Sequence, residues 1–188
     1  MNGMTVFLFL AEGFEETEAV ATLDILKRGD LNVISVSVTS RNIVTGAHGI
    51  AVVADQLFDE TDFSEGDMLV LPGGMPGTKN LNAHNGLQTL LLRYNKERKR
   101  IAAICAAPSV LGELKLLEGK RATVYPSFEN SLKGATLTDT PIVKDGNIIT
   151  AKGPGMVFDF GLAIVAELTG QEKADDVAAG MLLKEDGI

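Results

Sequence analysis

The 188-residue chain has one cysteine, two histidines and no tryptophan. A single cysteine excludes an intramolecular disulfide. The histidines, the cysteine and the carboxylates show no spacing typical of metal ligands, so we expect no metal. No apolar run approaches the roughly 20 residues that span a bilayer.

Basic residues are also few, with 17 Lys and Arg against 25 Asp and Glu and a formal net charge of −8. This balance argues against a nucleic-acid or anionic-membrane partner, because such surfaces need clustered basic residues. The one basic run, residues 96–100, comes at the end of a predicted helix, where cations favour the helix dipole. No segment has the pattern of a secretion signal, and we expect a cytoplasmic protein.

The composition suits one domain with a substantial core, since 45% of the residues are hydrophobic. The sequence contains no obvious linker and no internal repeat. Strand and helix patterns alternate, which predicts a mainly parallel sheet with helices on both faces. Predicted strands cover 5–10, 32–39, 68–71, 101–104 and 122–124, and predicted helices cover 15–28, 87–98, 109–114, 156–169 and 173–184. Residues 49–55 are expected to extend the sheet near an edge, and 142–150 to form a hairpin turning at Asp145-Gly146.

Cys105 lies where a short apolar run becomes a predicted helix. Residues 101–104 are typical of a parallel strand covered on both faces, and Pro108 suits the first turn of a helix. At such a corner the thiol stands at the carboxyl edge of the sheet, where free N–H groups and the helix dipole favour thiolate. The alternative is that Cys105 is a small buried hydrophobe.

Two other segments follow predicted strands in the same way. The loop 72–77 is rich in glycine, so its backbone can present N–H groups to a ligand, or it forms only a tight turn. In the segment 12–18, Glu15 and Glu16 suit a first helical turn. One more glutamate is then free to face the crevice above the sheet, or else it caps the helix and faces water. Because ligands of open α/β sheets bind at the carboxyl ends of the strands, this convergence favours a functional Cys105.

Four motifs together resemble the DJ-1/PfpI family, in the same order and with similar spacing. They are residues 12–18, 71–74, 103–108 and 152–155. The resemblance spans nearly the whole chain and is closest to the DJ-1 branch. It implies a single-domain flavodoxin-like sandwich over residues 1–188.

The resemblance also implies a site. Cys105 is the nucleophile, Glu18 is the carboxyl group bonded to its sulfur, and Gly74 and Ala106 supply the N–H groups of an oxyanion hole. Other residues expected around the substrate are Gly73, His48, Tyr125, Lys152, Gly153 and Pro154. We expect Glu18 and Cys105 to titrate as a coupled pair sharing one proton, with the pKa of Glu18 raised and that of Cys105 lowered.

Three positions depart from the family pattern. Ala106 stands where protease and hydrolase members have histidine, so a Cys-His dyad needs His48 or His84. We expect His84 on the surface of a polar loop, and peptidase activity is not expected. His48 and Lys152 both replace a frequent arginine, so Lys152 offers an anion a point charge and not a bidentate fork.

The resemblance leaves two functions open. One is a cofactor-independent glyoxalase or deglycase that acts on methylglyoxal-type 2-oxoaldehydes through Cys105 and Glu18. The other is a redox-sensing stress protein or chaperone in which Cys105 is oxidised to sulfinate. Family members are typically homodimers through the first helix, and apolar Val20, Leu23 and Leu26 lie on more than one face of that helix.

Overall fold

The computed structural model describes residues 3–183 and contains a seven-stranded sheet in the order β10-β11-β7-β6-β1-β2-β5. All neighbouring strands in it are parallel except β10 and β11. The bounds are β1 Thr5–Leu10, β2 Asn32–Ser37, β5 Gln56–Leu57, β6 Met68–Leu71, β7 Arg100–Ile104, β10 Ile142–Asp145 and β11 Ile148–Ala151. The predicted mainly parallel sheet is therefore confirmed. The hairpin over residues 142–150 is confirmed too, but it turns at Gly146-Asn147 and not at the predicted Asp145-Gly146, because Asp145 still pairs with Ile148.

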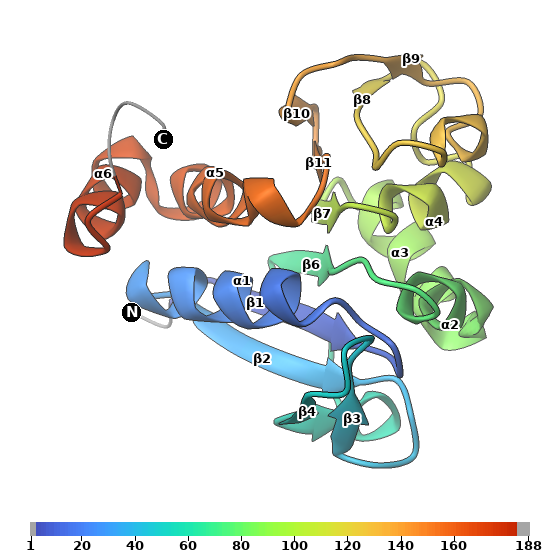
Figure 1. The fold of residues 1–188 in the computed structure, drawn as a ribbon, viewed down its shortest axis with the longest axis horizontal. Helices are drawn as coiled ribbons and strands as arrows, with labels where there is room; N and C mark the ends of the chain where they lie inside the picture. The colour runs from blue at the N-terminus through green and yellow to red at the C-terminus, as the bar shows by residue number, and fades with distance from the viewer. Residues whose placement is uncertain (1–2, 184–188) are drawn as a thin grey trace.

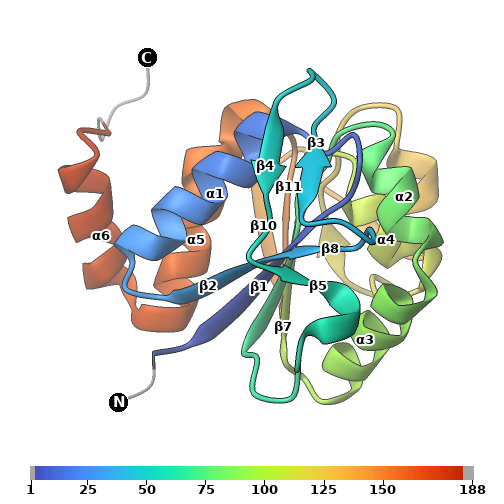
Figure 2. The same ribbon diagram turned by 90° about the horizontal axis from the view of Figure 1, so that it is seen from below.

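Helices cover both faces of this sheet (Figures 1 and 2). Their bounds are α1 Glu16–Arg28, α2 Gly77–Ala83, α3 Asn85–Lys96, α4 Pro108–Glu113, α5 Val157–Thr169 and α6 Gln171–Gly180. Helices α1, α5 and α6 lie on one face, and α2, α3 and α4 lie on the other. Among the described residues, no helix is long and apolar enough to cross a membrane.

Strand β1 shows why the two cores form. Val6, Leu8 and Leu10 join the core under α1 and α5, whereas Phe7 and Phe9 join the core under α3 and α4. Successive side chains of a strand point to opposite faces, so a continuous apolar run serves both layers.

The sheet order changes direction at β1, because the chain passes to β2 on one side and later to β6 on the other. Ligands of open α/β sheets bind at such a switch point, beyond the carboxyl ends of the strands. The segments after β1, β6 and β7 all reach this edge, as the sequence predicts.

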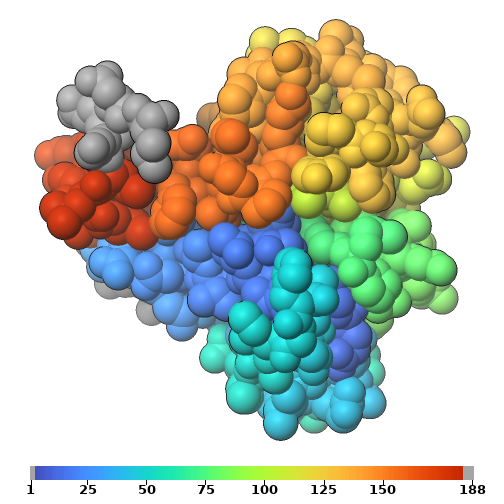
Figure 3. Space-filling view, viewed as in Figure 1, coloured from blue at the N-terminus to red at the C-terminus, as the bar shows by residue number. Residues whose placement is uncertain are grey.

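The predicted edge strand over residues 49–55 is wrong. Strands β3 (Ile43–Thr45) and β4 (Ala51–Val53) pair with each other as an antiparallel hairpin, and β5 takes the edge. Val44 is fully buried, and Val52 packs against the α1 core, so the hairpin is held by its own inner face. In Figure 3 the hairpin, in cyan, lies over the beginning of α1, in blue.

Other predicted bounds differ by a few residues. Strand β8 covers only Arg121–Ala122 and pairs with β9 (Thr136–Leu137) in a separate small sheet. The last predicted helix begins at Gln171 and ends at Gly180, and Lys184, its predicted end, lies outside the described residues. Three 3-10 turns complete the described elements: η1 Phe58–Glu60, η2 Glu129–Ser131 and η3 Pro154–Met156.

Candidate active site

Cys105 occupies a strained turn between β7 and α4. Its φ of 64° lies in the left-handed region, which is uncommon for a residue other than glycine. The turn is fixed on both sides, because the Cys105 N–H donates to the Ala151 carbonyl at 2.9 Å and the Cys105 carbonyl accepts from Tyr125 N–H at 2.8 Å. The residue is 8% exposed. A strained nucleophile held in this way is typical of a functional site.

Glu18 is fully buried in α1 and faces the end of β6. Its Oε2 accepts the Gly73 N–H at 2.7 Å, and its carboxyl group lies close enough to the Cys105 thiol for the two to influence each other's pKa. Its Oε1 has no hydrogen-bond partner within residues 3–183. The water-facing alternative for this glutamate is therefore wrong, and the helix is capped instead by Glu15, whose Oε2 accepts Glu18 N–H.

Burial raises the pKa of Glu18 to about 7, and the nearby charge of Glu15 acts in the same direction. The hydrogen bonds from Gly73 and Cys105 oppose this rise in pKa because they favour the carboxylate. A carboxyl group with this pKa exchanges protons readily near neutrality.

The pKa of Cys105 is raised to about 12, mainly by burial and then by the charge of Glu18 and the hydrogen bond to its carboxylate. The prediction of a lowered thiol pKa is therefore wrong. The N–H groups of Ala106 and Gly74 do lower this pKa, as the turn predicts, but burial outweighs them. Because the charge of Glu18 contributes to the raised pKa of Cys105, the two groups titrate as a coupled pair.

The two predicted oxyanion-hole residues lie beside the sulfur, where the backbone N–H groups of Ala106 and Gly74 act to lower the pKa of Cys105. Gly74 has a φ of 91°, and a Cβ there would lie 2.4 Å from the Glu15 nitrogen. Only glycine fits this close approach of two backbones. The pair of N–H groups is aimed at the position where negative charge would develop during attack by sulfur.

Gly73, which the resemblance places around the substrate, forms backbone hydrogen bonds to Glu18 and Glu15. Its N–H binds Glu18, and its carbonyl accepts the Glu15 N–H at 2.9 Å. Both of its backbone groups are thus used to hold the carboxyl group and α1 in place. Gly73 therefore positions Glu18, and its role in substrate binding stays a prediction.

Tyr125 and Gly153 lie against each other beside the Cys105 turn. A Cβ at Gly153 would be 3.2 Å from the Tyr125 ring, and Tyr125 is 45% exposed. Pro154 begins η3 directly after them. Lys152 pairs with Asp139, a highly exposed partner, and this ion pair directs the ammonium group. A role for these four residues in substrate binding stays a prediction.

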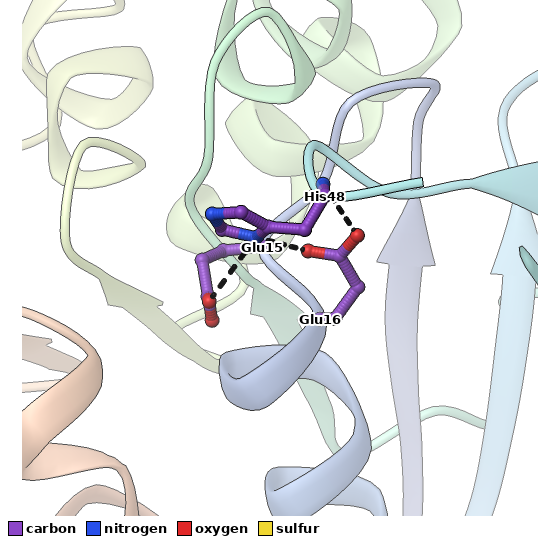
Figure 4. Close-up of side chains that lie close together, drawn as sticks. All are labelled: Glu15, Glu16 and His48. Carbon is purple, nitrogen blue, oxygen red and sulfur yellow. Dashed lines mark hydrogen bonds and ion pairs between the residues drawn. The ribbon is translucent and has the colours of Figure 1, made fainter. Parts of the chain in front are cut away.

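His48 is held by Glu16 at the beginning of α1 (Figure 4). Its Nδ1 lies 2.8 Å from Glu16 Oε2, and its backbone N–H donates to Glu16 Oε1 at 2.6 Å. The hydrogen bond and the charge of Glu16 raise the pKa of His48. For Glu16, the hydrogen bonds from His48 outweigh burial, and its pKa is lowered. His48 therefore connects the β3–β4 hairpin to α1, and its role toward a substrate stays a prediction.

Glu15, Glu16 and His48 are also the described side chains that place three possible metal-ligand atoms within 4.8 Å of one another. Glu16, however, already accepts hydrogen bonds from His48 and from Ile50 N–H. These bonds account for the cluster without an ion.

His84 is not the surface loop residue that the sequence predicts. Its Nδ1 accepts Leu87 N–H at 3.0 Å and so caps α3, and its ring lies 4.5 Å from that of Phe58. Burial lowers its pKa. The signal available in the sequence is that capping residues precede the first apolar turn of a helix, although histidine is a rare choice.

Comparisons with known proteins agree with this geometry. The model of the DJ-1/PfpI family matches residues 4–167. Protein DJ-1 homolog A of Arabidopsis thaliana is 39% identical over 96% of this chain, and Protein dj-1beta of Drosophila melanogaster is 34% identical over 95%. A protein of Pyrococcus abyssi named a deglycase is 31% identical over 82% of the chain and 93% of its own length.

Coverage differs among these relatives. The chain spans 97% of the Drosophila protein but only 47% and 41% of the Arabidopsis homologs A and B. Among solved structures, oxidized Toxoplasma gondii DJ-1 matches with a TM-score of 0.92 and 32% identity, over 96% of this chain and 98% of that one. Drosophila melanogaster DJ-1beta matches with a TM-score of 0.93 and 33% identity, over 97% and 99%. The predicted flavodoxin-like fold is confirmed.

Proposed function

Because the chain belongs to the DJ-1/PfpI family, we propose that it is a cofactor-independent glyoxalase or deglycase-like enzyme that acts on methylglyoxal-type 2-oxoaldehydes. Cys105 is the nucleophile and Glu18 is the acid and base. The observation that supports this most strongly is a fully buried carboxyl group, with a pKa of about 7, beside the only thiol of the chain.

The chemistry begins when the Cys105 sulfur adds to the aldehyde carbon while the Glu18 carboxylate accepts the thiol proton. Glu18 is suited to this role because its pKa of about 7 lets the carboxylate accept a proton near neutrality. The N–H groups of Gly74 and Ala106 stabilise the developing oxyanion. Glu18 then gives its proton to that oxygen, which forms a hemithioacetal.

The hemithioacetal isomerises to a thioester of a 2-hydroxy acid. Its C–H proton moves through Glu18 to the neighbouring carbonyl carbon, and its O–H proton moves to the oxygen of that carbonyl. The aldehyde carbon is thereby oxidised and the ketone carbon reduced, so the step needs no external redox partner. Water hydrolyses the thioester, releases the hydroxy acid and restores the thiol.

A peptidase is a poorer match to this chain. Ala106, and not a histidine, follows the cysteine. Both histidines form contacts with residues other than Cys105, since His48 binds Glu16 and His84 caps α3. A Cys-His dyad would have to break one of these arrangements.

Production of lactate from methylglyoxal by purified protein tests the proposal. Wild type is expected to form lactate, whereas Cys105→Ala and Glu18→Gln lose at least about a hundredfold in rate, the usual contribution of a general base or more. Far-ultraviolet circular dichroism of each variant serves as the control for folding. Equal rates for wild type and Cys105→Ala would exclude this mechanism.

A redox-responsive stress protein or chaperone is the second candidate, favoured by the oxidized state named for the Toxoplasma gondii protein. Peroxide would oxidise Cys105 to sulfinate, and the groups around the sulfur would hold the product. A peroxide-dependent mass gain at Cys105, without lactate formation, would support the redox role.

We also propose a cytoplasmic homodimer. A single cysteine suits a reducing compartment. Val20 on α1 and Ile43 and Val53 on the hairpin are large apolar side chains that are 47%, 57% and 69% exposed. Ile43 and Val53 are cross-strand partners, so both point away from the same side of the hairpin. A second copy of the chain would cover this apolar surface.

A further inference from the structure

A cavity of about 590 Å³ lies at the amino ends of β7 and β11, away from Cys105. The end of α3, the loop before β8 and the turn between β10 and β11 contribute to its walls. Arg100 begins β7 and Cys105 follows its last residue, so the two lie about 16 Å apart along the strand. We name this cavity the basic pocket. Its lining includes Asn95, Arg98, Arg100, Lys120, Asn147 and Glu167.

Positive charge dominates the basic pocket, although the whole chain has a formal net charge of −8. Glu167 is the one acidic residue of the lining, and it binds both Arg100, at 2.8 Å, and Lys144. One carboxylate cannot neutralise two cations. Arg98 and Lys120 make no ion pair with any residue of the described range 3–183. Positive charge therefore remains in excess around the cavity.

A favourable helix end does not explain these cations. Arg93 and Lys96 already occupy the last turn of α3, where they complement its dipole. Arg98 lies beyond that helix with a φ of 57°, and Lys120 lies in the loop before β8. Like charges held together repel one another, and a concave surface lined by one sign of charge concentrates ions of the other sign. The basic pocket is therefore suited to an anion.

Neighbouring groups keep the basic pocket open and polar. A Cβ at Gly146 would lie 2.9 Å from Lys120 Nζ, so glycine leaves room for the ammonium group at the hairpin turn. Asn147 Nδ2 donates to the Lys99 carbonyl at 2.9 Å and to Asn95 Oδ1 at 3.2 Å. These bonds hold both amides in place and leave Asn147 Oδ1 and Asn95 Nδ2 for hydroxyl groups of a ligand.

The lining also selects among anions. It contains no aromatic side chain, so the base of a nucleotide would find no stacking partner there. Arg98 and Lys120 come from separate walls, which suits two phosphate groups on one molecule better than a single phosphate ion. The volume lies within the range of small-molecule sites.

We propose that the basic pocket binds a sugar bisphosphate, a small polyol with a phosphate group at each end. Arg98 and Lys120 bind the two phosphate groups, and the amides of Asn95 and Asn147 bind hydroxyl groups. The site is separate from Cys105, so binding does not depend on the proposed function.

Isothermal titration calorimetry with fructose 1,6-bisphosphate tests the site, with fructose and inorganic phosphate as comparisons. Wild type should bind the bisphosphate at least about tenfold more tightly than phosphate, because two charged contacts act on one molecule. Fructose should not bind detectably. Arg98→Gln and Lys120→Gln should each weaken bisphosphate binding about tenfold, since each removes one charge-assisted hydrogen bond.

Lys79→Gln is the matched control, because it removes the same charge from an exposed position on α2, at the other end of the sheet. It should leave the Kd of the bisphosphate as in wild type. Arg98 is exposed, so Arg98→Gln maintains the test if Lys120→Gln does not fold. Cys105→Ala should also bind the bisphosphate as wild type does, whether or not the wild type forms lactate.

Four results would overturn the proposal. The first is no binding of the bisphosphate to wild type, or the same Kd in wild type, Arg98→Gln and Lys120→Gln. The second is equal affinity for phosphate and bisphosphate, which would indicate an adventitious ion only. The third is tighter binding of ADP than of the bisphosphate, which would exclude the proposed ligand class. The fourth is loss of binding in Cys105→Ala, which would place the ligand at the candidate active site.

Discussion

At the scale of single residues, the proposed chemistry depends on proton transfer between Cys105 and Glu18. Because the pKa of Glu18 is about 7, its carboxylate becomes available to accept the thiol proton only as the pH rises through neutrality. We predict that kcat/KM for methylglyoxal rises with pH and levels off above about 7, falling by up to about tenfold per unit well below it. A rate that is flat between pH 5.5 and 8 would contradict Glu18 as the base.

The same carboxyl group should make stability depend on pH. The pKa of Glu18 is raised in the folded state, from an ordinary value of 4.5 to about 7, so folding favours the neutral form. Wild type therefore loses stability as the pH rises from about 4.5 to 7, by about 3 kcal/mol from this group. Glu18→Gln removes this loss.

Urea unfolding of both proteins at pH 4.5 and pH 8 tests this prediction. Relative to wild type, Glu18→Gln should be more stable at pH 8 than at pH 4.5, by on the order of 3 kcal/mol. A difference between the two proteins that does not change with pH would show that Glu18 is not buried as a neutral acid.

The sequence predicts the identities of the site residues better than their electrostatics. The place of Cys105 at the edge of the sheet follows from its strand-end motif, because parallel strands bring their carboxyl ends to one edge, whereas Glu18, Gly74 and Ala106 were expected from the resemblance to the DJ-1/PfpI family. The thiol pKa was predicted in the wrong direction because it depends on the depth of burial, which a local pattern does not report.

At the scale of elements, the backbone of the loop after β6, at Gly74, packs directly against the backbone of the loop after β1, at Glu15. Gly74→Ala would bring a Cβ within 2.4 Å of the Glu15 nitrogen at a φ of 91°. We predict a loss of at least about 2 kcal/mol in unfolding free energy, together with loss of activity, because the oxyanion donor must move. Urea unfolding and the lactate assay measure the two effects.

Gly180→Ala is the control for this substitution. Gly180 ends α6 with nothing within 4 Å of an added Cβ, so its change should be neutral or stabilising by up to about 1 kcal/mol. If Gly74→Ala were as stable and active as Gly180→Ala, the close backbone crossing would not matter for the site.

The β3–β4 hairpin is attached to α1 through His48 and Glu16. The pKa of His48 is raised by Glu16, so the imidazole should stay charged to higher pH than a free histidine. Glu16→Gln is expected to return the pKa of His48 toward its ordinary value. Proton NMR titration can follow this shift, since the chain has only two histidines.

His84 supplies an internal reference in the same spectra. Burial lowers its pKa, so its signal should titrate below that of His48, and Glu16→Gln should leave it unmoved. Two histidines that titrate together in wild type would contradict the His48–Glu16 contact.

Long apolar strands and amphipathic helices were predicted well, and short elements were not. Strands β1 and β6 match their predicted bounds, because continuous apolar runs bounded by polar residues are unambiguous. Helix α2, which begins at Gly77, was not predicted, since its glycine, threonine and asparagines are poor helix formers. Its packing at the sheet edge overrides that propensity.

At the scale of the whole molecule, the exposed apolar surface on α1 and the hairpin predicts a dimer. Val53→Glu places a charge in that surface and should halve the molar mass measured by light scattering. Leu92→Glu is the matched control, because Leu92 is 46% exposed on α3, on the other face of the sheet. A monomeric wild type, or equal masses for wild type and Val53→Glu, would refute this interface.

The central claim is that Cys105 and Glu18 together convert a 2-oxoaldehyde without a cofactor. An enzyme-coupled lactate assay with methylglyoxal, in thiol-free buffer, tests it most directly with wild type, Cys105→Ala and Glu18→Gln. We predict lactate from wild type alone, with Cys105 of Glu18→Gln still open to alkylation. Absence of lactate from folded wild type, or equal rates for all three proteins, would contradict the account.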